Sequence, residues 1–149
     1  MKIYVAASSK ELERAERIMA ALRERGHEIT FDWTVPIRER AARGETDAKM
    51  SITERGFYAF QDTNGIEDAD LFWQLIPTTE SAGAWWELGY ATGLRNGKVK
   101  HPHVIVSGNP ERCLFTVLVP YSFAIDAQAL AYVLSLSPTT GVEAVPGWC

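Results

Sequence analysis

The chain begins with a pattern that strongly restricts its fold. Residues 3–7, "IYVAA", form a short apolar run, which is typical of a strand buried on both faces. A helical repeat of apolar residues follows, made of Leu12, Ala15, Ile18, Met19 and Leu22. Ser8 and Glu11 fit a capping box at the start of this helix, and Gly26 suits its end. A strand buried on both faces needs helices on each side, so the pattern predicts an α/β fold.

The rest of the chain repeats this alternation. We expect further strands at residues 29–33, 71–76, 104–106 and 122–125, and further helices at residues 49–68, 84–96 and 127–136. Residues 35–48 indicate a loop, and residues 113–119 fit either a strand or a short buried helix. Gly56 and Asn64-Gly65 are expected to weaken the helix at 49–68.

These elements predict one domain over residues 1–149, with a peripheral tail from about residue 137. Its expected architecture is a flavodoxin-like or Rossmann-like three-layer sandwich around a mostly parallel five-stranded sheet. Ligands in such folds bind beyond the carboxyl ends of the strands. No G-x-G-x-x-G fingerprint follows the first strand, so a dinucleotide-binding fold is disfavoured and no cofactor is expected.

The composition narrows the range of functions. The chain has a net charge of −4 with 23% charged residues, which does not suggest a surface for duplex nucleic acid. No apolar run approaches membrane-spanning length, and the N-terminus leads directly into the first predicted strand, so we expect a cytoplasmic protein without a signal peptide. Cys113 and Cys149 lie far apart and the histidines are not grouped with acids, so the sequence predicts no metal site.

Glu87 is the first candidate for chemistry. In "SAGAWWELGYATG", residues 81–93, it shares a helical face with Tyr90, Ala91 and Leu94. That face should pack on the sheet, which places Glu87 in the first helical turn at the ligand edge. A partly buried, ionised carboxylate there can act as a nucleophile or a base. The spacing alone also fits a glutamate that only stabilises the first turn of the helix.

Two longer stretches carry a family resemblance. "QDTNGIEDADLFWQLIP" followed by "SAGAWWELGYATG", together with "IYVAAS" near the N-terminus, resembles the nucleoside 2-deoxyribosyltransferase superfamily from residue 3 to about residue 106. The family pattern has an Asp before a helix that ends in Ala-Asp, then a strand and a loop. A small residue and a Gly then lead into E-L-G-x-A. The Ala-Asp of this chain ends at Asp70, which we interpret as structural.

The resemblance implies roles for three residues. Glu87 matches the family nucleophile, which attacks the anomeric carbon of the sugar and expels the base. Asp62 matches an acid that contacts the base or the sugar and assists departure of the base. Tyr4 matches a tyrosine on the first strand that hydrogen-bonds the nucleophile. From the residues alone, Asp62 also fits an acid on a helix surface, and Tyr4 fits a core aromatic with a satisfied hydroxyl.

Ser81 bears on the choice between two activities of that family. Many deoxyribosyltransferases carry an Asp six residues before the nucleophile, where it contacts the sugar 5′-hydroxyl. The branch that hydrolyses nucleoside 5′-monophosphates carries Ser there, and a hydroxyl can donate to a phosphate that a carboxylate would repel. Ser8, Ser9 and Gly83 lie at predicted helix starts, where more donors would face the phosphate. N-capping is the alternative role for Ser81 and Ser8.

The tryptophans and the quaternary state complete the expectations. Trp33, at the end of the second predicted strand, is a candidate for stacking on the base. Trp85 and Trp86 are expected at a protomer contact or at the edge of the core. The resemblance implies a homodimer or a larger homo-oligomer. Three functions stay open: a nucleoside 5′-monophosphate N-glycosidase, a nucleoside 2-deoxyribosyltransferase with the same glycosyl-enzyme intermediate, and a non-catalytic nucleotide-binding module.

Overall fold

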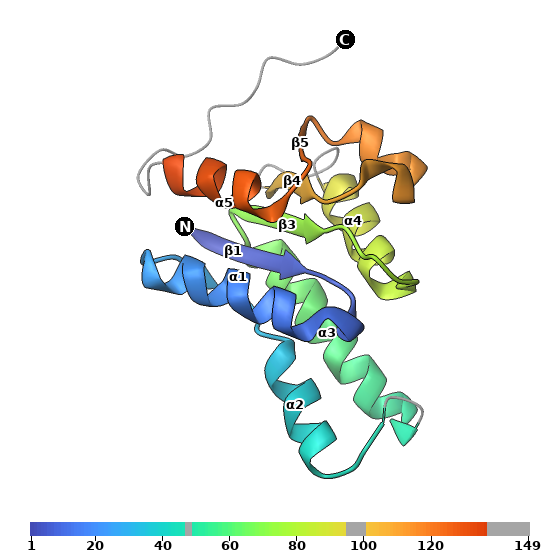
Figure 1. Cartoon of the computed structure of the whole chain (residues 1–149). Coiled ribbons are helices and arrows are strands. Elements are labelled where there is room, and N and C mark those ends of the chain that lie inside the picture. The colour runs from blue at the N-terminus through green and yellow to red at the C-terminus, as the bar shows by residue number, and fades with distance from the viewer. Residues whose placement is uncertain (47–48, 95–100, 137–149) are drawn as a thin grey trace.

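A parallel sheet of five strands forms the centre of the protein (Figure 1). The computed structural model describes residues 1–46, 49–94 and 101–136. The strands are β1 (Lys2–Ala6), β2 (Glu28–Ile29), β3 (Leu71–Leu75), β4 (His103–Ser107) and β5 (Tyr121–Phe123). They lie in the order β2-β1-β3-β4-β5, and every pair is parallel. This is the flavodoxin-like order, so the predicted α/β class is confirmed.

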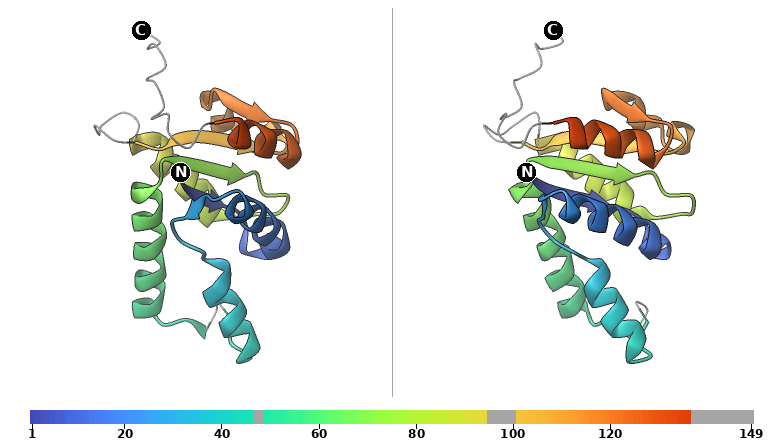
Figure 2. Two further views of the ribbon diagram at one scale, coloured as in Figure 1. Left: turned by 90° about the vertical axis from the view of Figure 1, so that its left-hand side faces the viewer. Right: turned by 60° about the vertical axis from the view of Figure 1, so that its left-hand side comes forward.

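Helices cover both faces of this sheet. They are α1 (Leu12–Glu24), α2 (Thr34–Ala42), α3 (Ile52–Asp68), α4 (Ala82–Leu94) and α5 (Asp126–Ser135). Figures 1 and 2 show α1 and α5 on one face and α3 and α4 on the other. Every residue of β3 is buried, as are all but the first of β1 and β4, which is why these strands are mostly apolar and do not alternate.

The structure corrects the prediction for residues 31–48. The second strand ends at Ile29, and Trp33 stands at the start of α2, so Trp33 does not end a strand. Asp32 turns the chain, because its Oδ1 accepts hydrogen bonds from the backbone N–H of Thr34 at 3.2 Å and from its hydroxyl at 2.5 Å. The expected loop at 35–48 is largely α2. This helix has no apolar stripe in its sequence, which is why no helical period was visible there.

The helix α3 is continuous through both glycines. Gly65 has a packing reason, because a Cβ atom built on it would lie 2.9 Å from Cβ of Phe31 and 2.9 Å from Cδ2 of Tyr4. The missing side chain therefore lets α3 approach β1 closely. Ser51 and Glu54 form a capping box that starts this helix, which compensates for the weak helix propensity of the glycines.

The capping box predicted at Ser8 and Glu11 is absent. Ser8 caps a short 3-10 helix, η1 (Ser9–Glu11), by accepting from the N–H of Lys10 at 3.3 Å, and α1 begins only at Leu12. The Glu11 carboxylate instead accepts from the backbone N–H of Thr78 at 3.1 Å. A short-range motif was therefore replaced by a contact between two loops at the same edge of the sheet.

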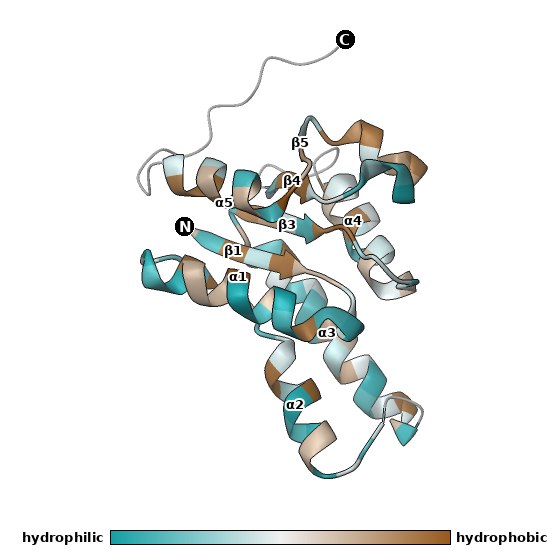
Figure 3. Cartoon of the chain, in the orientation of Figure 1, coloured by the Kyte–Doolittle hydropathy of each residue, from teal (hydrophilic) through white to brown (hydrophobic). Residues whose placement is uncertain are grey.

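The segment after β4 is exposed. Residues 113–119 contain a 3-10 helix, η4 (Leu114–Leu118), so neither the predicted strand nor a buried helix is present. Leu114, Phe115, Val117 and Leu118 are all more than 60% exposed, with values of 78%, 67%, 75% and 67%. The ribbon of this segment is largely brown in Figure 3, the colour of hydrophobic residues.

Some expectations concern residues outside the described part. The helix α4 is described to Leu94, and its predicted end near residue 96 lies outside the described residues. The predicted tail from residue 137, with Cys149, lies outside them as well. Within the described residues, none of the helices has the length and apolar character needed to cross a membrane.

Candidate active site

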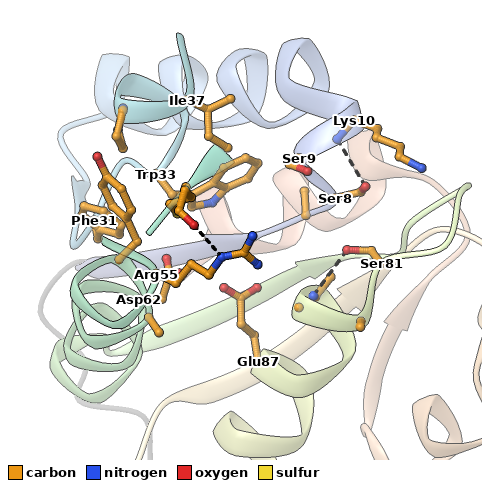
Figure 4. A pocket seen from close by; sticks show the side chains of 18 of the residues that line it. Ser8, Ser9, Lys10, Phe31, Trp33, Ile37, Arg55, Asp62, Ser81 and Glu87 are labelled. Atoms are coloured by element: carbon orange, nitrogen blue, oxygen red, sulfur yellow. Dashed lines mark hydrogen bonds between the residues drawn. The ribbon is translucent and has the colours of Figure 1, made fainter. Parts of the chain in front are cut away.

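Three side chains from different elements meet at the carboxyl end of the sheet. The hydroxyl oxygen of Tyr4, on β1, lies 2.8 Å from Oδ1 of Asp62 and 2.8 Å from Oε1 of Glu87. Asp62 lies on α3 and Glu87 on α4. Both acids line a cavity of about 460 Å³, a volume within the range usual for small-molecule sites (Figure 4). The structure thus brings together the three residues that the resemblance singled out.

The cavity occupies the place where ligands are expected in this fold. The chain leaves β1 toward β2 on one side, and β3 leads to β4 and β5 on the other, so the strand order reverses between β1 and β3. The segments that follow these two strands, residues 7–10 and 80–84, both line the cavity. Its other wall is formed by α2 and the N-terminal part of α3, which extend away from the sheet (Figure 2).

Tyr4 is held rigidly. Its side chain is fully buried and its ring stacks on Phe72 of the neighbouring strand, with centroids 5.8 Å apart. Gly65 packs closely against the edge of the ring that carries Cδ2 and Cε2. Tyr4 is therefore both a core aromatic and the hydrogen-bond partner of Glu87, so the two alternatives left open by the sequence are both present.

Glu87 reaches the cavity from the flank of α4. The buried face of this helix consists of Ala84, Leu88, Ala91 and Leu94. The predicted face, which included Glu87 and Tyr90, was therefore offset around the helix axis from the observed one. Glu87 is half-buried, and its carboxylate points into the cavity in Figure 4. Two of the four buried positions are alanines, and such small side chains let the helix backbone lie close to the sheet.

Burial gives both acids an unusual affinity for protons. It raises the pKa of Glu87 to about 8, with a further rise from the charge of Asp62, while the Tyr4 hydrogen bond lowers it. Burial also raises the pKa of Asp62 to about 6, against the lowering effect of its bond to Tyr4. Because the two acids share one hydroxyl, these values belong to the pair, which retains one proton near neutral pH.

Hydroxyl and backbone groups line the end of the cavity near α4 and η1. Ser8 is buried, and its Oγ lies 3.4 Å from Oγ1 of Thr79. The Oγ of Ser81 accepts from the N–H of Ala84 at 3.4 Å, which is a long bond. Ser9 and Gly83 are exposed and line the same end. Ser8 and Ser81 therefore cap helices and face the cavity at once.

A charged network holds the loop that carries Ser81. Besides its bond to the backbone, Glu11 accepts from the hydroxyl of Thr78 at 3.2 Å. Arg14 donates to Glu11 at 3.2 Å and to the carbonyl oxygen of Ile76 at 2.9 Å. It also forms two bonds of 2.7 Å to Asp126 at the start of α5. These contacts tie the loop between β3 and α4 to α1 and α5.

Aromatic and apolar side chains form the opposite end of the cavity. Trp33 is 8% exposed, and its indole N–H donates to the carbonyl oxygen of Val5 at 2.8 Å, which fixes the ring against β1. Trp33 lines the cavity from the start of α2, and its stacking on a base stays a prediction. Phe31 also lines this end, together with Pro36, Ile37, Arg40, Met50, Arg55, Tyr58 and Ala59.

Arg40 and Arg55 were not found from the sequence. Arg40 is 4% exposed and donates to the carbonyl oxygen of Thr46 at 3.1 Å. The Nε of Arg55 donates to the carbonyl oxygen of Met50 at 3.1 Å, and Figure 4 shows its guanidinium pointing toward Glu87. Both lie in charged stretches without a period, so only the tertiary fold, which puts α2 and α3 on the same wall of the cavity, brings them to the site.

Other residues singled out by the sequence lie elsewhere. Asp70 accepts from the N–H of Lys2 at 2.8 Å at the amino end of the sheet, which agrees with a structural role. Trp85 packs on the core, and Trp86 is exposed and stacks on Tyr90 with centroids 5.1 Å apart. Among the described residues, the cavity lining does not include Trp85 or Trp86. Nor do these residues contain a group of three or more His, Cys, Asp or Glu placed to hold a metal ion.

A comparison with solved structures finds the same fold in an N-glycosidase. The CMP N-glycosidase BcmB of Clostridium botulinum superimposes with a TM-score of 0.55 and 18% sequence identity. The match covers 89% of this chain and 98% of the BcmB chain. No protein-family model matches the chain, and no curated protein does. At this identity the likeness shows the fold, which agrees with the resemblance drawn from the sequence.

Proposed function

We propose that this protein hydrolyses the N-glycosidic bond of a (deoxy)nucleoside 5′-monophosphate, releasing the free base and the sugar 5-phosphate. The observation that carries the proposal is the meeting of Glu87, Tyr4 and Asp62 inside one cavity. Hydroxyls and helix starts lie at one end of that cavity, and aromatic side chains lie at the other. A nucleotide has a phosphate that suits the first end and a base that suits the second, with the sugar between them.

Glu87 would act as the nucleophile. Its carboxylate attacks the anomeric carbon, the bond to the base breaks, and a glycosyl-enzyme intermediate forms. Water then releases the sugar phosphate. Asp62 Oδ1 and Glu87 Oε1 each lie 2.8 Å from the Tyr4 hydroxyl oxygen. The two acids are therefore close together, as the carboxyl groups of retaining glycosidases are, at about 5 to 5.5 Å.

Asp62 would assist the departing base. Burial raises its pKa to about 6, so Asp62 accepts a proton more readily than an ordinary Asp and could pass it to the base. Trp33 would stack on the base, because the bond from its indole N–H to Val5 presents a fixed aromatic wall.

Ser8, Ser9, Ser81 and Gly83 would hold the 5′-phosphate. They line the cavity at the starts of η1 and α4, where backbone N–H groups and helix dipoles favour an anion. An acid at position 81 would disfavour a phosphate there. The name of BcmB, a CMP N-glycosidase with the same fold, supports a nucleotide substrate by analogy.

The test is incubation of the protein with nucleosides and 5′-monophosphates of each base, with and without a second free base, followed by chromatography of the products. We expect free base from monophosphates only. Base exchange would instead indicate a deoxyribosyltransferase. Binding without cleavage of any substrate would contradict both enzymatic functions and indicate a nucleotide-binding module.

The proposal includes a cytoplasmic protein that works as a homodimer or larger homo-oligomer. The exposed apolar side chains of η4, and those of Phe57 and Phe60 on α3, are surfaces that a second copy could cover. Sedimentation of the purified protein tests this part, and a monomer at all concentrations would contradict it.

A further inference from the structure

We infer that Tyr4 is a proton relay between the two acids: its hydroxyl takes a proton from Glu87 as it gives its own proton to Asp62. This exchange would prepare the nucleophile and the general acid in one event. The inference rests on the proposed function, because it concerns how the two acids reach the protonation states that the reaction needs.

The geometry requires more than one proton in the group. A phenol hydroxyl carries one hydrogen and can donate only one full hydrogen bond. Its oxygen nevertheless lies 2.8 Å from an oxygen of each acid, and both are hydrogen-bonding distances. Two ionised carboxylates at these positions would leave one of them without a hydrogen bond from Tyr4 and would repel each other. Both contacts are satisfied when one carboxyl group donates to the hydroxyl oxygen and the hydroxyl donates to the other acid.

Burial decides which acid holds this proton before substrate binds. The pKa of Glu87 is raised to about 8 and that of Asp62 to about 6, so Glu87 is the protonated member near neutral pH. The proposed reaction needs the reverse arrangement, because an ionised Glu87 attacks the sugar and a protonated Asp62 assists the base. The free protein is thus poised in the wrong protonation state for chemistry.

The relay corrects this state without exchanging a proton with water. The O–H bond of Glu87 breaks and its proton joins the Tyr4 oxygen, while the O–H bond of Tyr4 breaks and its proton joins Oδ1 of Asp62. The products are an ionised Glu87, an unchanged Tyr4 and a protonated Asp62. An acceptor atom on the base, such as a carbonyl oxygen or an unprotonated ring nitrogen, stabilises protonated Asp62, so bound ligand favours the exchange. Positive charge that develops on the sugar during the reaction then stabilises ionised Glu87 further.

The surroundings of Tyr4 suit this role. Burial, the charges of both acids and its bonds to them raise its pKa well above the ordinary value, so it stays neutral and acts through its single proton. Asp62 faces it from α3 and Glu87 from α4, and Phe72 of β3 is apolar. The other charged or titratable side chains of the cavity lining are Lys10, Arg40, Arg55, Tyr58 and Glu80.

Infrared spectroscopy with isotope labels can locate the proton without measuring activity. The stretching band of a protonated carboxyl group shifts when that carboxyl carbon is ¹³C, so labelling Glu or Asp separately shows which one holds the proton. In the free protein at pH 7, we expect one such band, assigned to Glu and lost in Glu87→Gln. With pseudouridine 5′-monophosphate bound, whose carbon–carbon glycosidic bond resists cleavage, we expect the band on Asp.

Tyr4→Phe tests the relay itself, because it keeps the stacked ring and removes only the hydroxyl. We expect the proton to remain on Glu when the ligand binds, and base release to fall about 100-fold. Tyr132→Phe is the matched control, since it removes the hydroxyl that bonds His103 at 3.0 Å on another part of the protein and should behave as wild type.

The outcomes separate the relay from the proposed function. A proton still on Glu with ligand bound to the wild-type protein, or a proton that reaches Asp in Tyr4→Phe, would overturn the relay alone. Absence of a protonated carboxyl band in the free protein would do the same. If neither pseudouridine 5′-monophosphate nor any nucleotide binds, the proposed function fails and the relay fails with it.

Discussion

Two groups of side chains in the cavity, the acids with Tyr4 and the serines at the end near α4 and η1, are built differently. Glu87, Tyr4 and Asp62 come from three separate elements and are joined by two bonds of 2.8 Å around a fully buried ring. Ser8 and Ser81 lie on short loops, and their hydroxyls make bonds of 3.3 to 3.4 Å. The side chains of the first group are fixed in position before a ligand binds, whereas the second group makes weak bonds that a ligand can replace. Mutations in the first group should therefore affect the chemical step, and mutations in the second should affect substrate binding.

The largest difference is expected from Glu87→Gln. This variant keeps the shape of the side chain but removes the nucleophile, so base release should fall by at least about 1000-fold, mainly in kcat. Single-turnover release of base measures the effect. Glu13→Gln, an exposed acid on α1, is the matched control and should retain wild-type activity. Full activity of Glu87→Gln would remove Glu87 from the mechanism.

Ser81→Asp should change the substrate instead of the chemistry. A carboxylate facing the 5′-phosphate should lower kcat/KM for monophosphates by about 100-fold, while nucleosides lose little or gain. Ser81→Ala should have a smaller effect of about 10-fold, mainly in KM, because it removes one donor without adding charge. Steady-state kinetics of both variants on matched nucleoside and monophosphate pairs measures these changes. An equal loss on both substrates would place Ser81 away from the phosphate.

The two groups should also differ in how stability depends on pH. The pKa of Glu87 is about 8 in the folded protein against an ordinary value of 4.5, so the folded state holds a proton that the unfolded state releases between these values. The free energy of unfolding therefore falls as pH rises through this window, and the full cost is present above pH 8.

Glu87→Gln should remove that cost. We expect it to be more stable than wild type by on the order of 2 to 4 kcal/mol at pH 9, with the difference shrinking toward pH 4.5. Ser81→Ala should show a difference that does not vary with pH. Urea unfolding at several pH values measures both, and a pH-independent difference for Glu87→Gln would show that Glu87 titrates normally.

Some of the site could be predicted because its signals are local. The apolar run of β1 and the helical repeat of α1 predicted the parallel sheet. Glu87 stood out near the start of α4, although the helix begins at Ala82 and so places Glu87 in its second turn and not in its first. The rest depends on long-range contacts. The capping box predicted at Ser8 and Glu11 is absent because the Glu11 carboxylate instead accepts a hydrogen bond from the backbone N–H of Thr78, 67 residues away. The helix α2 was missed because it lacks an apolar period.

The sequence by itself determined the alternation of strands and helices, and hence the edge at which a ligand would bind. It also placed Tyr4, Asp62, Ser81 and Glu87 in segments that lead to that edge. Only the tertiary structure decided that one hydroxyl lies between the two acids, and that burial raises the pKa of both. The reason is physical: periodicity fixes which way a side chain faces within its own element. Proton affinity depends on the water and charges that the other elements exclude or supply.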